Sequence, residues 1–102
     1  MELDEYQEQA KQTFIPTKHH LERLTLGLTG EAGEAADLVK KRLRQDTVSD
    51  EEIQSELGDV LWYIALLADE LNTSLDEIAS ANLHKLSQRN DNNTLRGTGH
   101  GR

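Results

Sequence analysis

The sequence contains no cysteine, which excludes a disulfide framework and a zinc site built on cysteine. It also lacks any apolar run long enough to span a membrane. The N-terminus, MELDEYQEQAKQ, is acidic and polar, unlike a secretory signal peptide. We therefore expect a cytoplasmic protein that has no membrane partner.

Positive charge is scarce in this chain. Lysine and arginine together number 11, against 19 aspartates and glutamates, which gives a formal net charge of -8. A protein that binds a nucleic acid backbone needs a basic face, so we expect no nucleic acid partner. A small phosphorylated ligand stays open, because a bound divalent cation would reverse the local sign of the charge.

Residues that favour strands are few, and no segment alternates strictly between apolar and polar side chains, so the sequence predicts an all-α fold. The first helix ends before Pro16, because the residue that precedes a proline avoids the helical region. Ser49 and Ser74 each have a glutamate three residues later, and both pairs are typical of capping boxes that open a helix. The predicted helices span residues 3–13, 21–44, 50–71 and 75–89.

We expect one small domain over residues 1–89 and a flexible tail over residues 90–102. The tail is mostly Asn, Gly, Thr and Arg with a single Leu, and it has no core of its own. Residues 60–68, VLWYIALLA, are apolar almost all round, which is typical of a helix buried on every side. Four helices of one short chain hardly supply that cover, so we predict a dimer with a shared core.

Four acidic residues lie on the second and third predicted helices without the positive neighbours that commonly accompany such residues. Glu31 and Glu34 stand three residues apart in one helix, and Glu56 and Asp59 do so in the next. A solvent-exposed acid often has a lysine or arginine three or four residues away, and none of these four does. One interpretation is a simple solvated face, but both pairs border an apolar stripe.

The glycines near these acids suggest a second interpretation. Gly30, Gly33 and Gly58 interrupt the two helices, and each costs roughly 1 kcal/mol against alanine. We expect them to let another backbone approach closely. If the helices pack antiparallel there, four carboxylates converge on one pocket that is stable only with cations inside. Oxygen ligands select Mg²⁺, for which Mn²⁺ can substitute, whereas a ferritin-like di-iron site needs a Glu-x-x-His motif that these helices lack.

The acid pairs and their surroundings resemble a known family. Glu31-Ala-Gly-Glu34 followed by Glu56-Leu-Gly-Asp59 is similar to the E-x-x-E and E-x-x-D motifs of the MazG-like all-α nucleoside triphosphate pyrophosphohydrolases. The segments GLTGEAGEAADLVKK, ELGDVLWYIA and ANLHKLSQR also resemble that family's helices, so the similarity covers residues 3–89 and implies a four-helix MazG-like bundle. Many relatives continue with Tyr-Pro after the last segment, where this chain has Asn-Asp.

The resemblance implies hydrolysis of a nucleoside triphosphate, usually a deoxynucleotide, to the monophosphate and pyrophosphate. It also implies dependence on Mg²⁺, a dimer or a dimer of dimers, and a house-cleaning or pool-control role. By position, the catalytic metal ligands would be Glu31, Glu34, Glu56 and Asp59. Asn82 and Lys85 fall where the family places groups that meet the phosphates, and their spacing puts both on one face of the last helix.

Four further residues have a binding interpretation, and for three of them there is also a plainer one. Tyr63 lies on the acid face of its helix and could contact the sugar or base, while Trp62 could stack on it, although rings on a buried helix usually belong to the core. Lys41 could reach a phosphate, but Asp37, four residues before it, offers a salt bridge. Gln7 in the first helix could read the base.

Two other functions remain open at this level. Phosphoribosyl-ATP pyrophosphohydrolase is an alternative enzyme, because this relative uses the same acid pattern. A non-catalytic helical binding or assembly module is an alternative of a different class, and it would show no metal-dependent binding heat and no release of pyrophosphate.

Overall fold

The computed structural model describes residues 1–91, and this part of the chain consists of four α-helices joined by loops. The described residues contain no strand, so the all-α prediction is confirmed. Among the helices of residues 1–91, none qualifies as a membrane-spanning segment. The helices are α1 (Leu3–Lys11), α2 (His20–Leu43), α3 (Asp50–Glu70) and α4 (Leu75–Asp91).

Both predicted serine caps are present. The Ser49 hydroxyl accepts a hydrogen bond from the backbone N–H of Glu52 at 3.1 Å, and the Ser74 hydroxyl accepts one from Glu77 at 3.1 Å. The Glu77 carboxylate accepts a hydrogen bond from the Thr73 hydroxyl at 2.6 Å, one residue before the position that a capping box would use. These short-range bonds explain why the starts of α3 and α4 could be predicted from the sequence.

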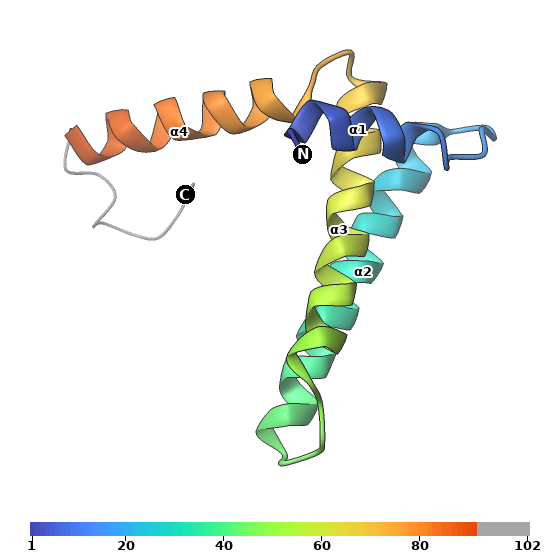
Figure 1. Ribbon diagram of the computed structural model, residues 1–102, viewed down its shortest axis with the longest axis vertical. Helices are drawn as coiled ribbons and strands as arrows, with labels where there is room; N and C mark the ends of the chain where they lie inside the picture. Colours follow the sequence, from blue (N-terminus) through green and yellow to red (C-terminus); the bar gives the residue numbers. More distant parts are fainter. Residues whose placement is uncertain (92–102) are drawn as a thin grey trace.

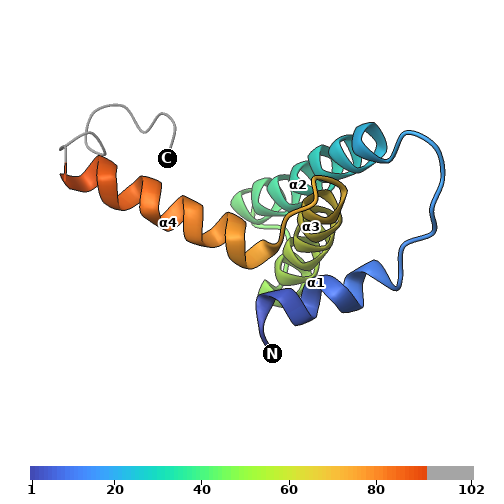
Figure 2. The ribbon, with the colours of Figure 1, turned by 90° about the horizontal axis from the view of Figure 1, so that it is seen from above.

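The helices form an extended arrangement in the single chain. α2 and α3 make a long antiparallel hairpin, and α1 crosses α3 near the end of the hairpin where α3 finishes (Figure 1). α4 extends away from the hairpin, contacting α1 and α3 but not α2 (Figures 1 and 2). The radius of gyration is 16.2 Å, against about 13 Å for a compact domain of this length. The four helices therefore do not close into a bundle within one chain.

The end of α4 lies slightly beyond the sequence prediction. The helix was expected to end at Arg89, and it continues to Asp91. The predicted tail began at Asn90, which is still helical, and the remainder of that tail, residues 92–102, lies outside the described residues.

The core is small and consists of alanine and leucine. Tyr6, Trp62 and Ile64 pack against the part of it that joins α1, α3 and the start of α4. Leu26 and Leu83 stay 73% and 67% exposed, so a large apolar surface has no cover in one chain. The second copy predicted to cover residues 60–68 stays a prediction. Within residues 1–91, the buried apolar side chains are those of Ala10, Leu24, Ala65, Leu66, Ala68 and Leu75.

Candidate active site

Carboxylates from the two hairpin helices meet at one place. Glu31 on α2, and Glu56 and Asp59 on α3, each offer one oxygen, and the three oxygens lie within 4.8 Å of one another. Glu34 lies outside this group of three, but its side chain reaches Glu56 by a hydrogen bond. The antiparallel packing of α2 and α3 therefore brings the two predicted acid pairs together rather than leaving them on separate solvated faces.

Two oxygens of the Glu31 and Glu56 carboxylates are in an unusual position. Glu31 Oε2 and Glu56 Oε2 are shielded from solvent, and no hydrogen-bond donor among the described residues reaches them. When Glu56 holds a proton it forms a hydrogen bond with the Glu31 carboxyl, and this bond raises the pKa of Glu56. Desolvation and the charges of Glu31 and Asp59 act in the same direction, while a hydrogen bond with Glu34 lowers this pKa. Carboxylates this close repel one another unless a proton or a cation lies between them.

This set of ligand atoms fits a divalent cation. Hard cations bind carboxylate oxygens. A divalent cation would coordinate the two oxygens that lack a donor, and its charge would remove the repulsion between the acids. Glu31 and Glu56 are half-buried and Asp59 is exposed, so the cluster has one side open to a ligand. The cluster can thus hold a metal ion and present it to a solvent-borne substrate.

The glycines of the hairpin act differently from the prediction. A Cβ atom at Gly30, Gly33 or Gly58 would meet nothing within 4 Å, so the expectation that these three allow a close approach is wrong within the single chain. Gly27 has that function instead, because an alanine methyl there would overlap the Tyr63 ring. Gly27 lies one helical turn before Glu31, so this contact sets the spacing of α2 and α3 next to the acid cluster.

Both aromatic rings of α3 have packing partners. Tyr63 meets Trp62 edge to face, with ring centroids 4.9 Å apart, and Trp62 meets Phe14 in the same manner at 6.2 Å. The Trp62 indole N–H donates to the Thr13 hydroxyl at 2.8 Å. These contacts favour the core interpretation of both rings, and a substrate contact by Tyr63 stays a prediction.

The predicted phosphate-binding residues lie apart from the acids. Asn82 and Lys85 are exposed on α4, where they line an open hollow of about 320 Å³ together with Ile78 and Ala81. Because α4 does not contact α2, one chain does not bring these two residues to Glu31. Their contact with phosphates stays a prediction.

Lys41 has the plainer of its two predicted partners. Its Nζ atom lies 3.2 Å from Asp37 Oδ2, one helical turn earlier on α2. Both side chains are about half exposed, so the pair is a surface salt bridge of small energetic value. A phosphate contact by Lys41 stays a prediction, since it would compete with this pair.

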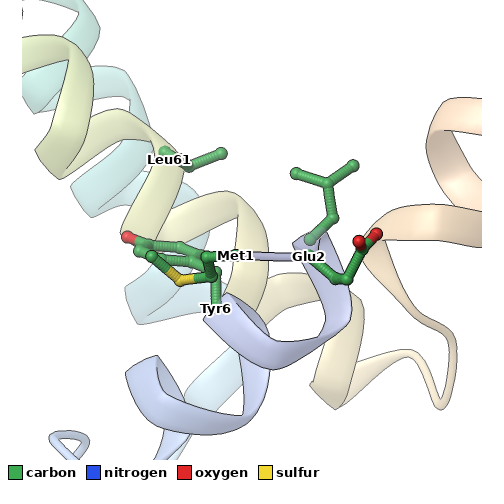
Figure 3. Close-up of a pocket in the computed structure, with 5 residues that line it drawn as sticks. Met1, Glu2, Tyr6 and Leu61 are labelled. Carbon is green, nitrogen blue, oxygen red and sulfur yellow. The ribbon is translucent and has the colours of Figure 1, made fainter.

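α1 contributes residues that the sequence analysis did not identify. Burial and the charge of Asp59, one of the three clustered acids, raise the pKa of the Tyr6 phenol. Its ring lines a largely apolar hollow of about 180 Å³ together with Met1, Glu2, Leu3 and Leu61 (Figure 3). No sequence signal marks Tyr6, because its place depends on how α1 crosses α3.

Gln7 differs from its prediction. The side chain is buried, with its amide bonded to the backbone of Thr73 and of Leu75 in the turn between α3 and α4. The prediction that Gln7 reads a base is therefore wrong, because both ends of the amide already serve this turn.

Comparison with known proteins identifies a family and two relatives. The profile of the MazG nucleotide pyrophosphohydrolase domain matches residues 19–94. The chain is 41% identical over 114 aligned residues to the gene 37 protein of Mycobacterium phage L5, with 100% of both chains covered. It is 31% identical to the uncharacterized protein YpjD of Bacillus subtilis (strain 168), covering 86% of this chain and 79% of that protein. No solved structure matches the chain.

Proposed function

Because the chain belongs to the MazG nucleotide pyrophosphohydrolase family, we propose that it hydrolyses a nucleoside triphosphate, with ribose or deoxyribose, to the monophosphate and pyrophosphate. The observation that supports this most directly is the meeting of three carboxylate oxygens from α2 and α3. Two of these three side chains, Glu31 and Glu56, also carry an oxygen that is shielded from solvent and has no hydrogen-bond donor. We propose Mg²⁺ as the ion, with Mn²⁺ as a substitute. When bound, the ion would neutralise phosphate charge and lower the pKa of a water.

The side chains of this chain then have separate tasks. Glu31, Glu56 and Asp59 would hold the ion, and Glu34, next to Glu56, would complete the acidic set. Without a cation, this cluster would repel a triphosphate. Lys85 would supply a point charge for the phosphates and Asn82 a directed hydrogen-bond donor.

We further propose that the working unit is a dimer or a dimer of dimers. Leu26 and Leu83 are largely exposed, as is Leu57 at 54%, and apolar surface of this extent on a short chain favours association. Since α4 does not contact α2 in one chain, Asn82 and Lys85 would serve the acids of a second copy. The proposed substrate would place the protein in the cytoplasm.

A screen for pyrophosphate release tests the proposal. The common ribo- and deoxyribonucleoside triphosphates and phosphoribosyl-ATP are each incubated with the protein and Mg²⁺, and the products are separated as monophosphate and pyrophosphate. We expect turnover of at least one nucleoside triphosphate and its loss on addition of a chelator. Glu56→Gln should abolish turnover while leaving the helices formed, because it replaces one carboxylate of the cluster by a neutral amide.

The control for this variant is Glu51→Gln. Glu51 is an exposed acid in the first turn of the same helix and lies outside the cluster, so its replacement changes the net charge equally and should leave the rate unchanged. Turnover of phosphoribosyl-ATP alone would replace the proposal by that alternative enzyme. Absence of pyrophosphate from every substrate, with no Mg²⁺ binding by calorimetry, would instead indicate the non-catalytic module.

A further inference from the structure

The start of α4 is held by side chains of α1. The first N–H groups of any α-helix have no partner within the helix and need an acceptor from outside. In α4, the N–H of Leu75 donates to Gln7 Oε1 at 2.7 Å and the N–H of Asp76 donates to Asp4 Oδ1 at 3.0 Å. Only the third, that of Glu77, is served locally, by Ser74. Two of the first three amides of α4 are therefore capped by another helix.

The other end of the Gln7 amide strengthens this attachment. Its Nε2 atom donates to the carbonyl of Thr73 at 3.1 Å, so one side chain bonds the backbone on both sides of Ser74, in the turn from α3 to α4. Gln7 is 8% exposed and is the only buried polar residue within residues 1–91. Hydrogen bonds in such a shielded place are costly to break, because the freed groups find no water.

α4 has little else to fix its direction. It contacts α1 and α3 but not α2, and it points away from the hairpin (Figure 2). Ile78 and Leu83 on it are 41% and 67% exposed. With a rise of 1.5 Å per residue, Lys85 lies about 15 Å along the helix from Leu75, so a tilt of about 20° at the start of α4 would move Lys85 by roughly 5 Å. A small error at the start of α4 thus becomes a large displacement at the residues proposed to meet phosphate.

We propose that Gln7, assisted by Asp4, is a positioning residue that fixes the direction of α4 and with it the place of Asn82 and Lys85 relative to the acid cluster. α1 is suited to this because it packs against α3, the helix that carries Glu56 and Asp59, while its Gln7 bonds the turn into α4. One short helix thereby joins the metal-binding side of the site to the phosphate-binding side. The effect on catalysis rests on the proposed function, whereas the effect on the direction of α4 does not.

The direction of α4 can be measured by spin labels, since the chain has no cysteine of its own. Labels at Thr47→Cys, in the exposed turn between α2 and α3, and Ser87→Cys, exposed on α4, report the distance between the hairpin and α4. Labelled chains diluted in excess unlabelled protein give only the distance within one chain. We expect Gln7→Ala to broaden or shift the distance distribution. Gln9→Ala, an exposed glutamine on the same helix, is the control and should leave it unchanged.

Kinetics with the best substrate of the screen test the consequence for the site. For Gln7→Ala we expect KM to rise about tenfold, which is the factor that corresponds to the loss of one or two hydrogen bonds, and kcat to change less. The affinity for Mn²⁺ should not change, because Gln7 is not among the acids. In a Lys85→Ala background the same substitution should raise KM much less, since the residue that it misplaces is already gone.

Asp4→Ala removes only the exposed hydrogen bond that the N–H of Asp76 donates to Asp4. This variant keeps the test valid if Gln7→Ala does not fold. It should broaden the distance distribution and raise KM in the same direction by a smaller factor. An unchanged distance distribution in the folded variants, or additive effects of Gln7→Ala and Lys85→Ala on KM, would overturn the proposal. If the wild-type protein hydrolyses no nucleotide, the proposed function fails, and the distance measurement still decides whether α1 directs α4.

Discussion

Replacing Gly27 with alanine tests whether the hairpin depends on the contact between this glycine and Tyr63. Alanine is favoured over glycine inside a helix by about 1 kcal/mol. At Gly27 the new methyl would overlap the Tyr63 ring, and overpacking of this kind costs about 1–3 kcal/mol. The two terms oppose each other, so we expect Gly27→Ala to lower the free energy of unfolding by about 0–2 kcal/mol.

Gly33 and Gly58 are matched controls on the same two helices. A Cβ atom at either position meets nothing within 4 Å, so only the gain in helix propensity remains. Gly33→Ala and Gly58→Ala should each raise stability by about 1 kcal/mol. The free energy of unfolding of Gly27→Ala should therefore lie about 1–3 kcal/mol below that of the control variants. Each kcal/mol corresponds to a change of about 4–8 °C in Tm for a domain of this size.

Thermal unfolding followed by circular dichroism, at one protein concentration because association shifts Tm, measures these differences. In a Tyr63→Ala background, the cost of Gly27→Ala should vanish, since the ring that it overlaps is absent. A Gly27→Ala protein as stable as the two controls would refute the idea that this contact sets the helix spacing. A loss of stability in Gly33→Ala would show that another chain packs against that glycine.

Three further predictions follow from the site and the caps. Mg²⁺ should raise the Tm of the wild-type protein and not that of Glu56→Gln, as measured by thermal unfolding with the ion and with a chelator. The pKa of Glu56 is raised above its ordinary value of 4.5, so the folded metal-free protein binds more protons than the unfolded chain. The contribution of Glu56 to stability is therefore complete below pH 4.5 and is lost as the pH rises through the higher pKa of the folded state. Glu56→Gln should remove this dependence on pH, as measured by denaturant unfolding at a series of pH values. Ser49→Ala, which removes the cap of α3, should cost about 1 kcal/mol in the same assay, and an unchanged midpoint would argue against the cap.

The predictions that succeeded depend on neighbours in the sequence. Ser49 and Ser74 cap their helices through bonds that span three residues, so spacing alone indicated them. The two acid pairs were found because each lies within one helical turn and lacks a basic neighbour, a pattern visible without a fold. That the pairs meet required only that consecutive helices pack antiparallel, which is the commonest arrangement for a helical hairpin.

The predictions that failed depend on the packing of distant segments. The choice of glycine at the close contact was wrong because the contact involves Gly27 and Tyr63, and helical spacing does not say which of several glycines a ring will cover. Gln7 was assigned to a ligand because a polar residue on a short helix gives no sign that it will be buried against a turn more than 60 residues away.

The sequence by itself determined the four helices, the serine caps of two of them and the acid pair on each hairpin helix, because helix formation and capping are governed by groups within a few residues of one another. The tertiary structure alone decided that α1 packs against α3, that Gln7 and Asp4 cap α4, and that α4 leaves the hairpin instead of closing on it. Those outcomes depend on shape and hydrogen bonding between α1 and residues far along the chain, which no local pattern encodes.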